Sequence, residues 1–252
     1  MVFSVIDAQG DLTAEQIVDR SFKATKLDGS EATSTMTIMD KKGRERVRKI
    51  ALVTKLFDNG ATEKRLIRFL SPADVKGTGL LTFDYEKEDD DMWLFMPALR
   101  KTRRIVSSEK SKNFMGSEFS YADMTPPTLE DFAYKILGEE EVGGVLCWKI
   151  EMVPKDDDIA DGNGFSKRIG FIAKKDFVIR KAIYYDLDGE LHKELAVKEV
   201  REVDSKNHKY RPMHMIMVNI QNERKSILIV NEIQFNPNIK DEYFTTRYLE
   251  RY

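Results

Sequence analysis

The sequence predicts a mainly β protein, built as one antiparallel barrel or sandwich. Three observations lead to this prediction. About a dozen short runs are β-like, turn residues separate most of them at hairpin spacing, and a well-capped helix is predicted only near the N-terminus. Strands joined by hairpins favour an antiparallel sheet over βαβ units. With 252 residues, 41% of them hydrophobic, the chain can build one such core.

The first predicted element is a helix over residues 12–22. Thr13 is suited to the N-cap, and Gln16 stands at the capping-box position three residues later. Ile17 and Phe22 share one face, so this helix is expected to pack on the sheet through them.

After the helix the apolar period changes to two. Met36 and Ile38 alternate with Thr35 and Thr37, and Asp40 to Gly43 then turn the chain. The predicted strands cover residues 35–38, 47–53, 62–70, 80–85, 92–96, 101–106, 145–153, 165–172, 177–185, 190–203, 213–221 and 225–235.

One long segment, residues 107–138, interrupts the strands. It contains Met115-Gly116 and the pair Pro126-Pro127, and its end, 129–137, is predicted to be a short helix. Loops of this length in compact domains are usually functional or disordered, and this one is expected to act as a lid. Residues 156–164 are interpreted as an acidic surface loop. Since no interdomain linker is visible, residues 1–252 are expected to form a single domain.

Composition excludes several classes of protein. Lys plus Arg total 41 against 43 Asp plus Glu, and a net charge of -2 argues against a nucleic-acid partner. Cys147 is the only cysteine, so it forms no internal disulfide and is interpreted as a buried strand thiol. No run approaches the ~20 apolar residues of a membrane helix. No signal peptide is visible in Met1 to Asp7, so an exported protein would need an export segment outside this sequence.

Motifs of catalysis are not found. His192, His208 and His214 stand far apart without metal-ligand spacing, and the chain has no GxSxG, P-loop or GxGxxG. The acidic runs 89–91 and 156–158 are more typical of solvated turns than of acid/base pairs. The sequence therefore predicts no catalytic residue, no metal site and no cofactor.

Two residue groups suggest binding. Arg100, Lys101, Arg103 and Arg104 form a basic cluster, which is either a solvated surface or a contact for anionic lipid headgroups or an acidic partner. Methionine, with 11 copies, suits either ordinary core packing or an apolar surface that accepts varied hydrophobic ligands.

Two stretches carry a family resemblance. Residues 69–81 read FLSPADVKGTGLL, and residues 93–105 read WLFMPALRKTRRI, followed by FMGSEFSYADM at 114–124. Together with the N-terminal helix and the ending FTTRYL at 244–249, they resemble the bacterial outer membrane lipoprotein-sorting protein family. That family is related in fold to the lipoprotein carriers LolA and LolB and is often encoded beside RND-type (MmpL-like) lipid exporters. Its members commonly carry an acidic pair where this chain has Glu118 and Ala122.

The resemblance implies a half-open antiparallel β-barrel of about 11–12 strands, with a helical and loop lid around a hydrophobic cavity. It implies a non-enzymatic periplasmic carrier that delivers a lipid (phospholipid or fatty-acyl chains) or a lipoprotein between envelope components in outer membrane biogenesis. An inner-membrane RND/MmpL-type transporter is the expected partner, with peripheral membrane contact. A lipid- or lipoprotein-binding sensor or adaptor subunit is the alternative, and lipidation of the native N-terminus stays open.

A ligand cavity in a barrel requires inward rows of apolar side chains. On the strand 213–220, the methionines are expected to face the ligand, and Ile216, Val218 and Ile220 to pack on the N-terminal helix. The predicted cavity lining is Met36, Ile67, Phe69, Trp93, Phe95, Met213, Met215 and Met217. The predicted lid residues are Phe114, Met115, Phe119 and Tyr121.

Overall fold

One antiparallel sheet of 13 strands makes up most of the described chain, in the order β6-β5-β4-β3-β2-β1-β13-β12-β11-β10-β9-β8-β7. The computed structural model describes residues 12–236 and 238–251, so the segment Met1 to Asp7, in which no signal peptide is visible, lies outside the described residues. The sheet is not closed, because β6 and β7 lie at its two edges. The predicted mainly β, half-open barrel is confirmed, with a strand or two more than expected.

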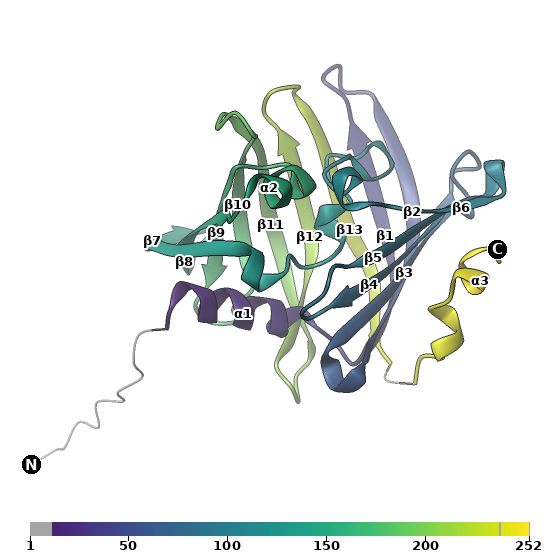
Figure 1. The fold of residues 1–252 in the computed structure, drawn as a ribbon, viewed down its shortest axis with the longest axis horizontal. Helices are drawn as coiled ribbons and strands as arrows, with labels where there is room; N and C mark the ends of the chain where they lie inside the picture. Colours follow the sequence, from purple (N-terminus) through teal and green to yellow (C-terminus); the bar gives the residue numbers. More distant parts are fainter. Residues whose placement is uncertain (1–11, 237, 252) are drawn as a thin grey trace, which may run out of the picture.

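The strands follow the predicted hairpin pattern (Figure 1). Their bounds are β1 Gly29–Met39, β2 Glu45–Phe57, β3 Thr62–Ser71, β4 Gly79–Tyr85, β5 Asp91–Met96, β6 Lys101–Arg104, β7 Phe132–Val142, β8 Val145–Pro154, β9 Lys167–Ala173, β10 Ile179–Tyr185, β11 Leu191–Asp204, β12 Lys209–Asn219 and β13 Arg224–Phe235.

The prediction of a helix over 129–137 is wrong. Only Leu129–Asp131 form a 3₁₀ turn, and the chain then enters β7, which pairs with β8 along its length. Gly143 and Gly144, at φ 59° and 79°, make the tight hairpin turn between these strands. Cross-strand pairing has overridden a weak local helical pattern.

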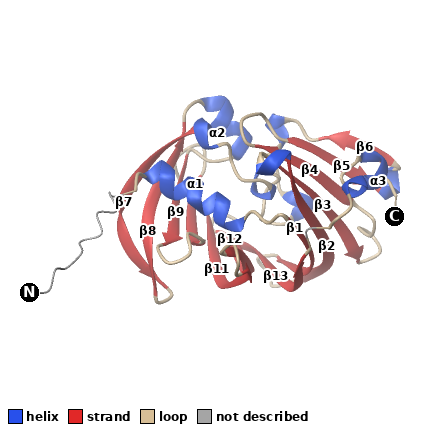
Figure 2. Ribbon diagram, turned by 90° about the horizontal axis from the view of Figure 1, so that it is seen from below, coloured by secondary structure: helices blue, strands red, loops and turns tan. Residues whose placement is uncertain are grey.

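The sheet curves, so its two faces differ. The inner face carries side chains such as Ile50, Leu195 and Met217, and Figure 2 shows it curving around α1 and α2. The segment between β6 and β7, residues 105–131, also sends side chains into this space. The opposite, convex side of the sheet is the outer face.

Helix α1 (Ala14–Thr25) lies on the inner face. Its capping box is confirmed, with the Thr13 side chain accepting from the Gln16 amide. Ile17 and Val18 pack on Ile150 and Ile172 of β8 and β9. The expectation that this helix covers Ile216, Val218 and Ile220 is therefore wrong. Those three point to the outer face, where Ile216 and Val218 are half-buried and Ile220 is 42% exposed.

The C-terminal segment covers part of the outer face. Helix α3 (Thr246–Leu249) and Phe244 pack on Leu66, Leu81 and Phe95 of β3 to β5. Gly79 makes this contact possible, because a Cβ there would lie 2.6 Å from the Leu249 Cδ1 atom.

The predicted acidic loop 156–164 contains a helix, α2 (Asp157–Asn163), which corrects the prediction. The Asp156 side chain caps it by accepting from the Ile159 amide, and Gly164 ends it at φ 73°. None of the helices in residues 12–236 and 238–251 is long and apolar enough to cross a membrane.

Candidate functional site

A cavity of about 380 Å³ lies between the inner face, α1 and residues 122–127. That volume falls within the roughly 300–1,000 Å³ of sites for small molecules. Most of its lining is apolar, as expected for a site that takes a hydrophobic ligand. The aliphatic and aromatic side chains from helix and sheet include Val18, Phe22, Met36, Ile150, Leu195 and Met217.

Four predicted lining residues reach this cavity. Met36 on β1, Ile67 on β3, and Met215 and Met217 on β12 all border it. Phe69 does not: it is 1% exposed, and its ring packs against Phe114 with centroids 5.7 Å apart.

The placement of Trp93, Phe95 and Met213 in the cavity is corrected by the structure. Trp93 and Phe95 lie on the outer face of β5 with α3, while Met92 and Leu94 face inward. Successive side chains of a strand alternate sides, so both aromatic residues were placed one position out of phase. Met213 is buried but does not border the cavity.

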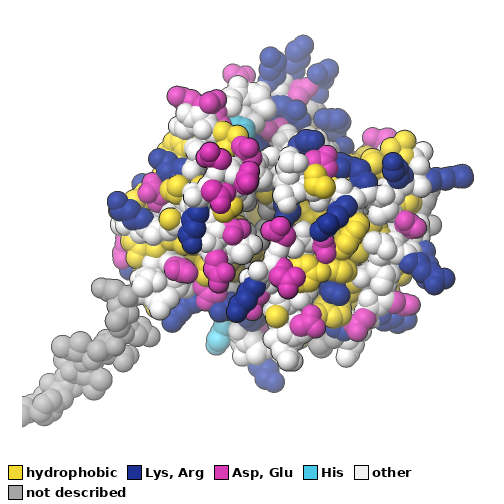
Figure 3. Space-filling model, in the orientation of Figure 1, with side chains coloured by type: hydrophobic (Ala, Val, Ile, Leu, Met, Phe, Trp, Pro, Cys, Tyr) yellow, Lys and Arg dark blue, Asp and Glu magenta, His cyan; other side chains and the backbone are white. Residues whose placement is uncertain are grey.

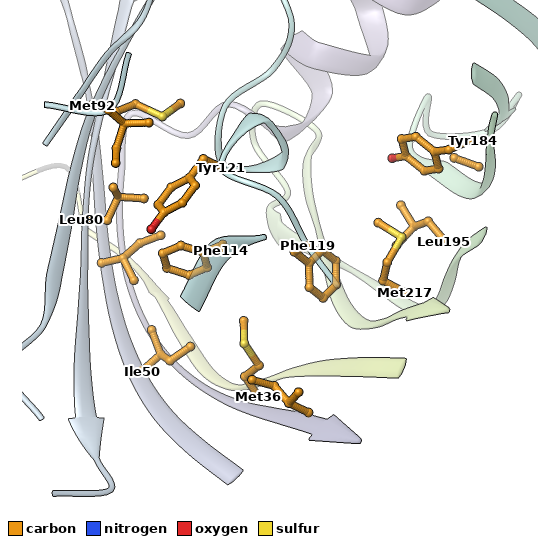
Figure 4. Packing of buried hydrophobic residues seen from close by; sticks show 14 of the residues in the cluster. Met36, Ile50, Leu80, Met92, Phe114, Phe119, Tyr121, Tyr184, Leu195 and Met217 are labelled. Carbon is orange, nitrogen blue, oxygen red and sulfur yellow. The ribbon is translucent and has the colours of Figure 1, made fainter. Parts of the chain in front are cut away.

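The predicted lid residues fill space on the inner face of the sheet as well as covering it. Phe114, Phe119 and Tyr121 are buried, and the rings of Phe114 and Tyr121 meet edge to face at 5.5 Å. Figure 4 shows both rings close to Leu80 of the sheet, with Phe119 nearer Met217. Met115 is half-buried, and its backbone carbonyl accepts a hydrogen bond from Arg48.

A buried carboxylate anchors this loop. Glu118 is fully buried, and its Oε1 lies 2.9 Å from Nε of Arg224, while Oε2 accepts from Asn219 at 3.0 Å. Its backbone amide donates to Ser226 Oγ at 2.8 Å, and its carbonyl accepts from Lys193 Nζ at 3.1 Å. The family resemblance pointed to Glu118, but its partners on β11 to β13 were missed because no local pattern links them.

The second acidic position of the family, here Ala122, has no acid. Next to it, the Asp123 carboxylate borders the cavity and accepts from the Ser120 amide at 2.7 Å and the Ser120 hydroxyl at 2.9 Å. These bonds close a local turn, so the Asp123 carboxylate makes its hydrogen bonds within its own loop.

Charged side chains also reach the cavity, which sequence reasoning missed. Arg65 and Arg211 line it and share the fully buried Glu63: Arg65 Nη2 is 2.6 Å and Arg211 Nη2 is 3.6 Å from its oxygens. Burial alone would raise the pKa of Glu63, but the two guanidiniums outweigh it and hold that pKa below its usual value. Arg168 is a third lining arginine.

Two further acids lie buried nearby. Asp84 pairs with Lys26 at 3.1 Å, and burial raises the pKa of Asp84 to about 6 despite the neighbouring cation. Asp90 pairs with Lys110 at 3.6 Å and accepts from the Thr125 hydroxyl, and burial likewise raises its pKa.

The basic cluster lies apart from the cavity, around the β5–β6 turn. Arg103 pairs with Glu109 at 2.7 Å and Arg104 pairs with Asp91, whereas Arg100 and Lys101 are exposed at the turn. The surface around it is of mixed sign, since Figure 3 shows acidic and basic side chains interspersed over this side of the molecule.

The three histidines do not meet. His192 Nε2 lies 3.3 Å from Asn219 Nδ2, His208 pairs with Glu202 at 3.2 Å on the surface, and His214 lies on β12 with a half-buried side chain. In the described part of the chain, no three His, Cys, Asp or Glu side chains are placed to hold a metal ion.

Comparison with known proteins places the fold. A family model described only as "Uncharacterized protein" matches residues 61–251, and no curated protein matches the chain. A crystal structure assigned as an outer membrane lipoprotein-sorting protein domain from Vibrio parahaemolyticus is similar, with TM-score 0.85, 27% identity, and coverage of 94% of this chain and 98% of that one. A DUF1329 family protein from Desulfovibrio piger gives TM-score 0.85 and 26% identity, with 94% and 97% covered.

A LolA superfamily protein from Nitrosomonas europaea shares the fold, with TM-score 0.70 and 18% identity over 94% of this chain and 100% of that one. The family model covers well over half of the sequence, and the residues that it matches include the motifs at 69–81 and 93–105. The chain therefore belongs to the family described by the model that matches residues 61–251, it is similar to an outer membrane lipoprotein-sorting domain, and its fold is LolA-like.

Proposed function

We propose that this protein is a periplasmic carrier, which holds a lipid or the lipid portion of a lipoprotein in its cavity and delivers it between envelope components. One observation carries the proposal: an apolar cavity of about 380 Å³ lies under a helix and a loop on the inner face of an open sheet. Removing apolar surface from water stabilises by roughly 25 cal/mol per Å². The apolar lining of the cavity would gain this stabilisation from a bound acyl chain. Binding, and no catalysis, is the role proposed for it.

The relatives support this function. The Vibrio parahaemolyticus domain is assigned to outer membrane lipoprotein sorting, and at 27% identity it is similar over nearly the whole of both chains. Residues 1–252 are accordingly proposed to act as one unit, with Met36, Ile67, Met215 and Met217 in contact with the ligand.

The β5–β6 turn is the proposed contact with a membrane surface or a transporter. Leu99 is 64% exposed beside the exposed Arg100 and Lys101, a combination that suits anionic headgroups. An RND-type exporter is the proposed partner at this turn.

Native mass spectrometry of purified protein, followed by organic extraction and lipid analysis, tests for a bound amphiphile. Transfer of that amphiphile between donor and acceptor vesicles then separates a carrier from a sensor or adaptor, since a sensor would bind without speeding transfer. A protein that neither retains nor binds amphiphiles would refute the proposal.

A further inference from the structure

A row of side chains, all but one of them polar, crosses the inner face beside the cavity. Strand register places Tyr134, Met152, Arg168 and Tyr184 opposite one another on β7 to β10. The same row continues through Lys193, Asn219 and Arg224 on β11 to β13. Direct cross-strand partners share a face, so all seven side chains point to the same side of the sheet.

The polar side chains at the two ends of this row differ in their hydrogen-bond and ion-pair partners. On β12 and β13 the chain supplies its own acid, because Asn219 and Arg224 contact the Glu118 carboxylate, while Lys193 of β11 donates to the Glu118 backbone carbonyl. On β9, none of the ion pairs or side-chain hydrogen bonds among the described residues includes Arg168. Its Nε is buried without a hydrogen-bond partner, and the residue borders the cavity.

The surroundings of Arg168 favour an added anion. Its guanidinium lies 5.2 Å from the centre of the Tyr184 ring, which fixes its plane, and the Tyr134 hydroxyl, in the same row, is buried without a partner. Among the described residues that line the cavity, the one acid is Asp123, and its carboxylate accepts hydrogen bonds from Ser120. A partly buried cation without a carboxylate is costly, and a bidentate acid would relieve that cost.

We propose that the ligand is an anionic amphiphile whose carboxylate or phosphate is bound by Arg168 while its acyl chain occupies the apolar cavity. This rests on the proposed carrier function and narrows it, because the lipid end of a lipoprotein carries no acid. Arg65 and Arg211 already share Glu63, so Arg168 is the arginine assigned to the headgroup.

The test compares amphiphiles of one chain length: a fatty acid, the matching lysophosphatidic acid, the matching fatty alcohol and a triacylated lipopeptide. Calorimetry on the full chain should show the acids binding at least about 10-fold more tightly than the alcohol, the ratio expected of one charge-assisted hydrogen bond. Arg168→Met should remove that preference and leave alcohol binding unchanged, whereas Arg168→Lys should retain part of it. Lys167→Met, the same charge change one residue away on the outer face, should alter neither.

Equal binding of acid and alcohol, an undiminished preference in Arg168→Met, or lipopeptide binding as tight as that of the acid would overturn this assignment and leave the carrier intact. Acetate and inorganic phosphate should not compete; competition by either would indicate a small-anion site and also overturn it. If no amphiphile of either charge binds, the carrier function itself fails and the headgroup site with it.

Discussion

Two regions of the same sheet are completed in different ways. On β4 and β5, the inner face (Leu80, Met92, Leu94) is covered by the aromatic side chains of the loop, and the outer face is covered by α3. On β8 to β12, the inner face borders a cavity, and the outer face carries only a small cluster around Phe171. We refer to these as the packed region and the cavity region.

The outer faces show the contrast most clearly. Leu80 and Leu81, adjacent on β4, are both fully buried because each side of the strand has a cover. In the cavity region Phe171 is shielded by side chains of the sheet itself, with Lys149 Nζ at 5.4 Å and Lys181 Nζ at 5.5 Å from its ring centre. The packed region therefore supplies stability, and the cavity region leaves apolar surface for a ligand.

The largest effect is expected from removing the ring of Phe69 on β3, which packs on the loop aromatics that cover the packed region. Phe69→Ala should lower the free energy of unfolding by about 3–5 kcal/mol, because it opens a void between Phe114 and the sheet. Phe22→Ala, the same change in the cavity lining, should cost clearly less, since Phe22 is only half-buried and already borders empty space. Urea unfolding measures both, and equal losses would contradict the division into two regions.

The pH dependence of stability should reveal the buried carboxyl group of Asp84 at the edge of the packed region. The pKa of Asp84 is raised from 3.8 to about 6, so between these values the folded protein binds more protons than the unfolded chain. This contribution to stability is complete below pH ~4 and is lost as pH rises through ~6, on the order of 2–3 kcal/mol. Asp84→Asn should flatten urea midpoints over that range; an unchanged profile would show that Asp84 does not titrate there.

The loop that joins the two regions is expected to depend on its buried carboxylate. Glu118→Gln weakens the contact with Arg224 while keeping the shape, so stability should fall by about 1.5–3 kcal/mol. Hydrogen exchange of residues 107–128 should speed up relative to β12 and β13, and bound amphiphile should slow it. Asp123→Asn is the control, since among the described residues the Asp123 carboxylate is hydrogen-bonded only to Ser120 of its own loop. If it loosened the loop equally, the anchoring role of Glu118 would be wrong.

The smallest effect is expected on the outer face of the cavity region. Val218→Glu places the acid between Glu194 and Lys225 on neighbouring strands, so the loss of stability should stay within about 1 kcal/mol. Met215→Glu, three residues away, faces the cavity and should abolish binding of a fluorescent fatty-acyl probe. Thermal melting and probe titration of both variants show which face of β12 borders the ligand. If Val218→Glu lost probe binding and Met215→Glu kept it, the two faces would be assigned the wrong way round.

Much of the fold could be predicted because its signals are local. The capping box at Thr13 and Gln16 and the two-residue period of the strands act within a few residues of sequence, and they are present in the structure. The family motifs extended this to the half-open barrel and pointed to Glu118. Four of the predicted lining residues, Met36, Ile67, Met215 and Met217, border the cavity.

Only the tertiary structure decided the remaining features. Trp93 and Phe95 belong to a strand that is apolar on both faces, so its phase became known only when α3, far along the chain, covered one of them. The pairing of Glu63 with Arg211 and the row that places Arg168 on the same face as Tyr134 depend on register across several strands. Local propensity determines which residues form strands, whereas long-range register determines which side chains meet, and no short-range pattern encodes the latter.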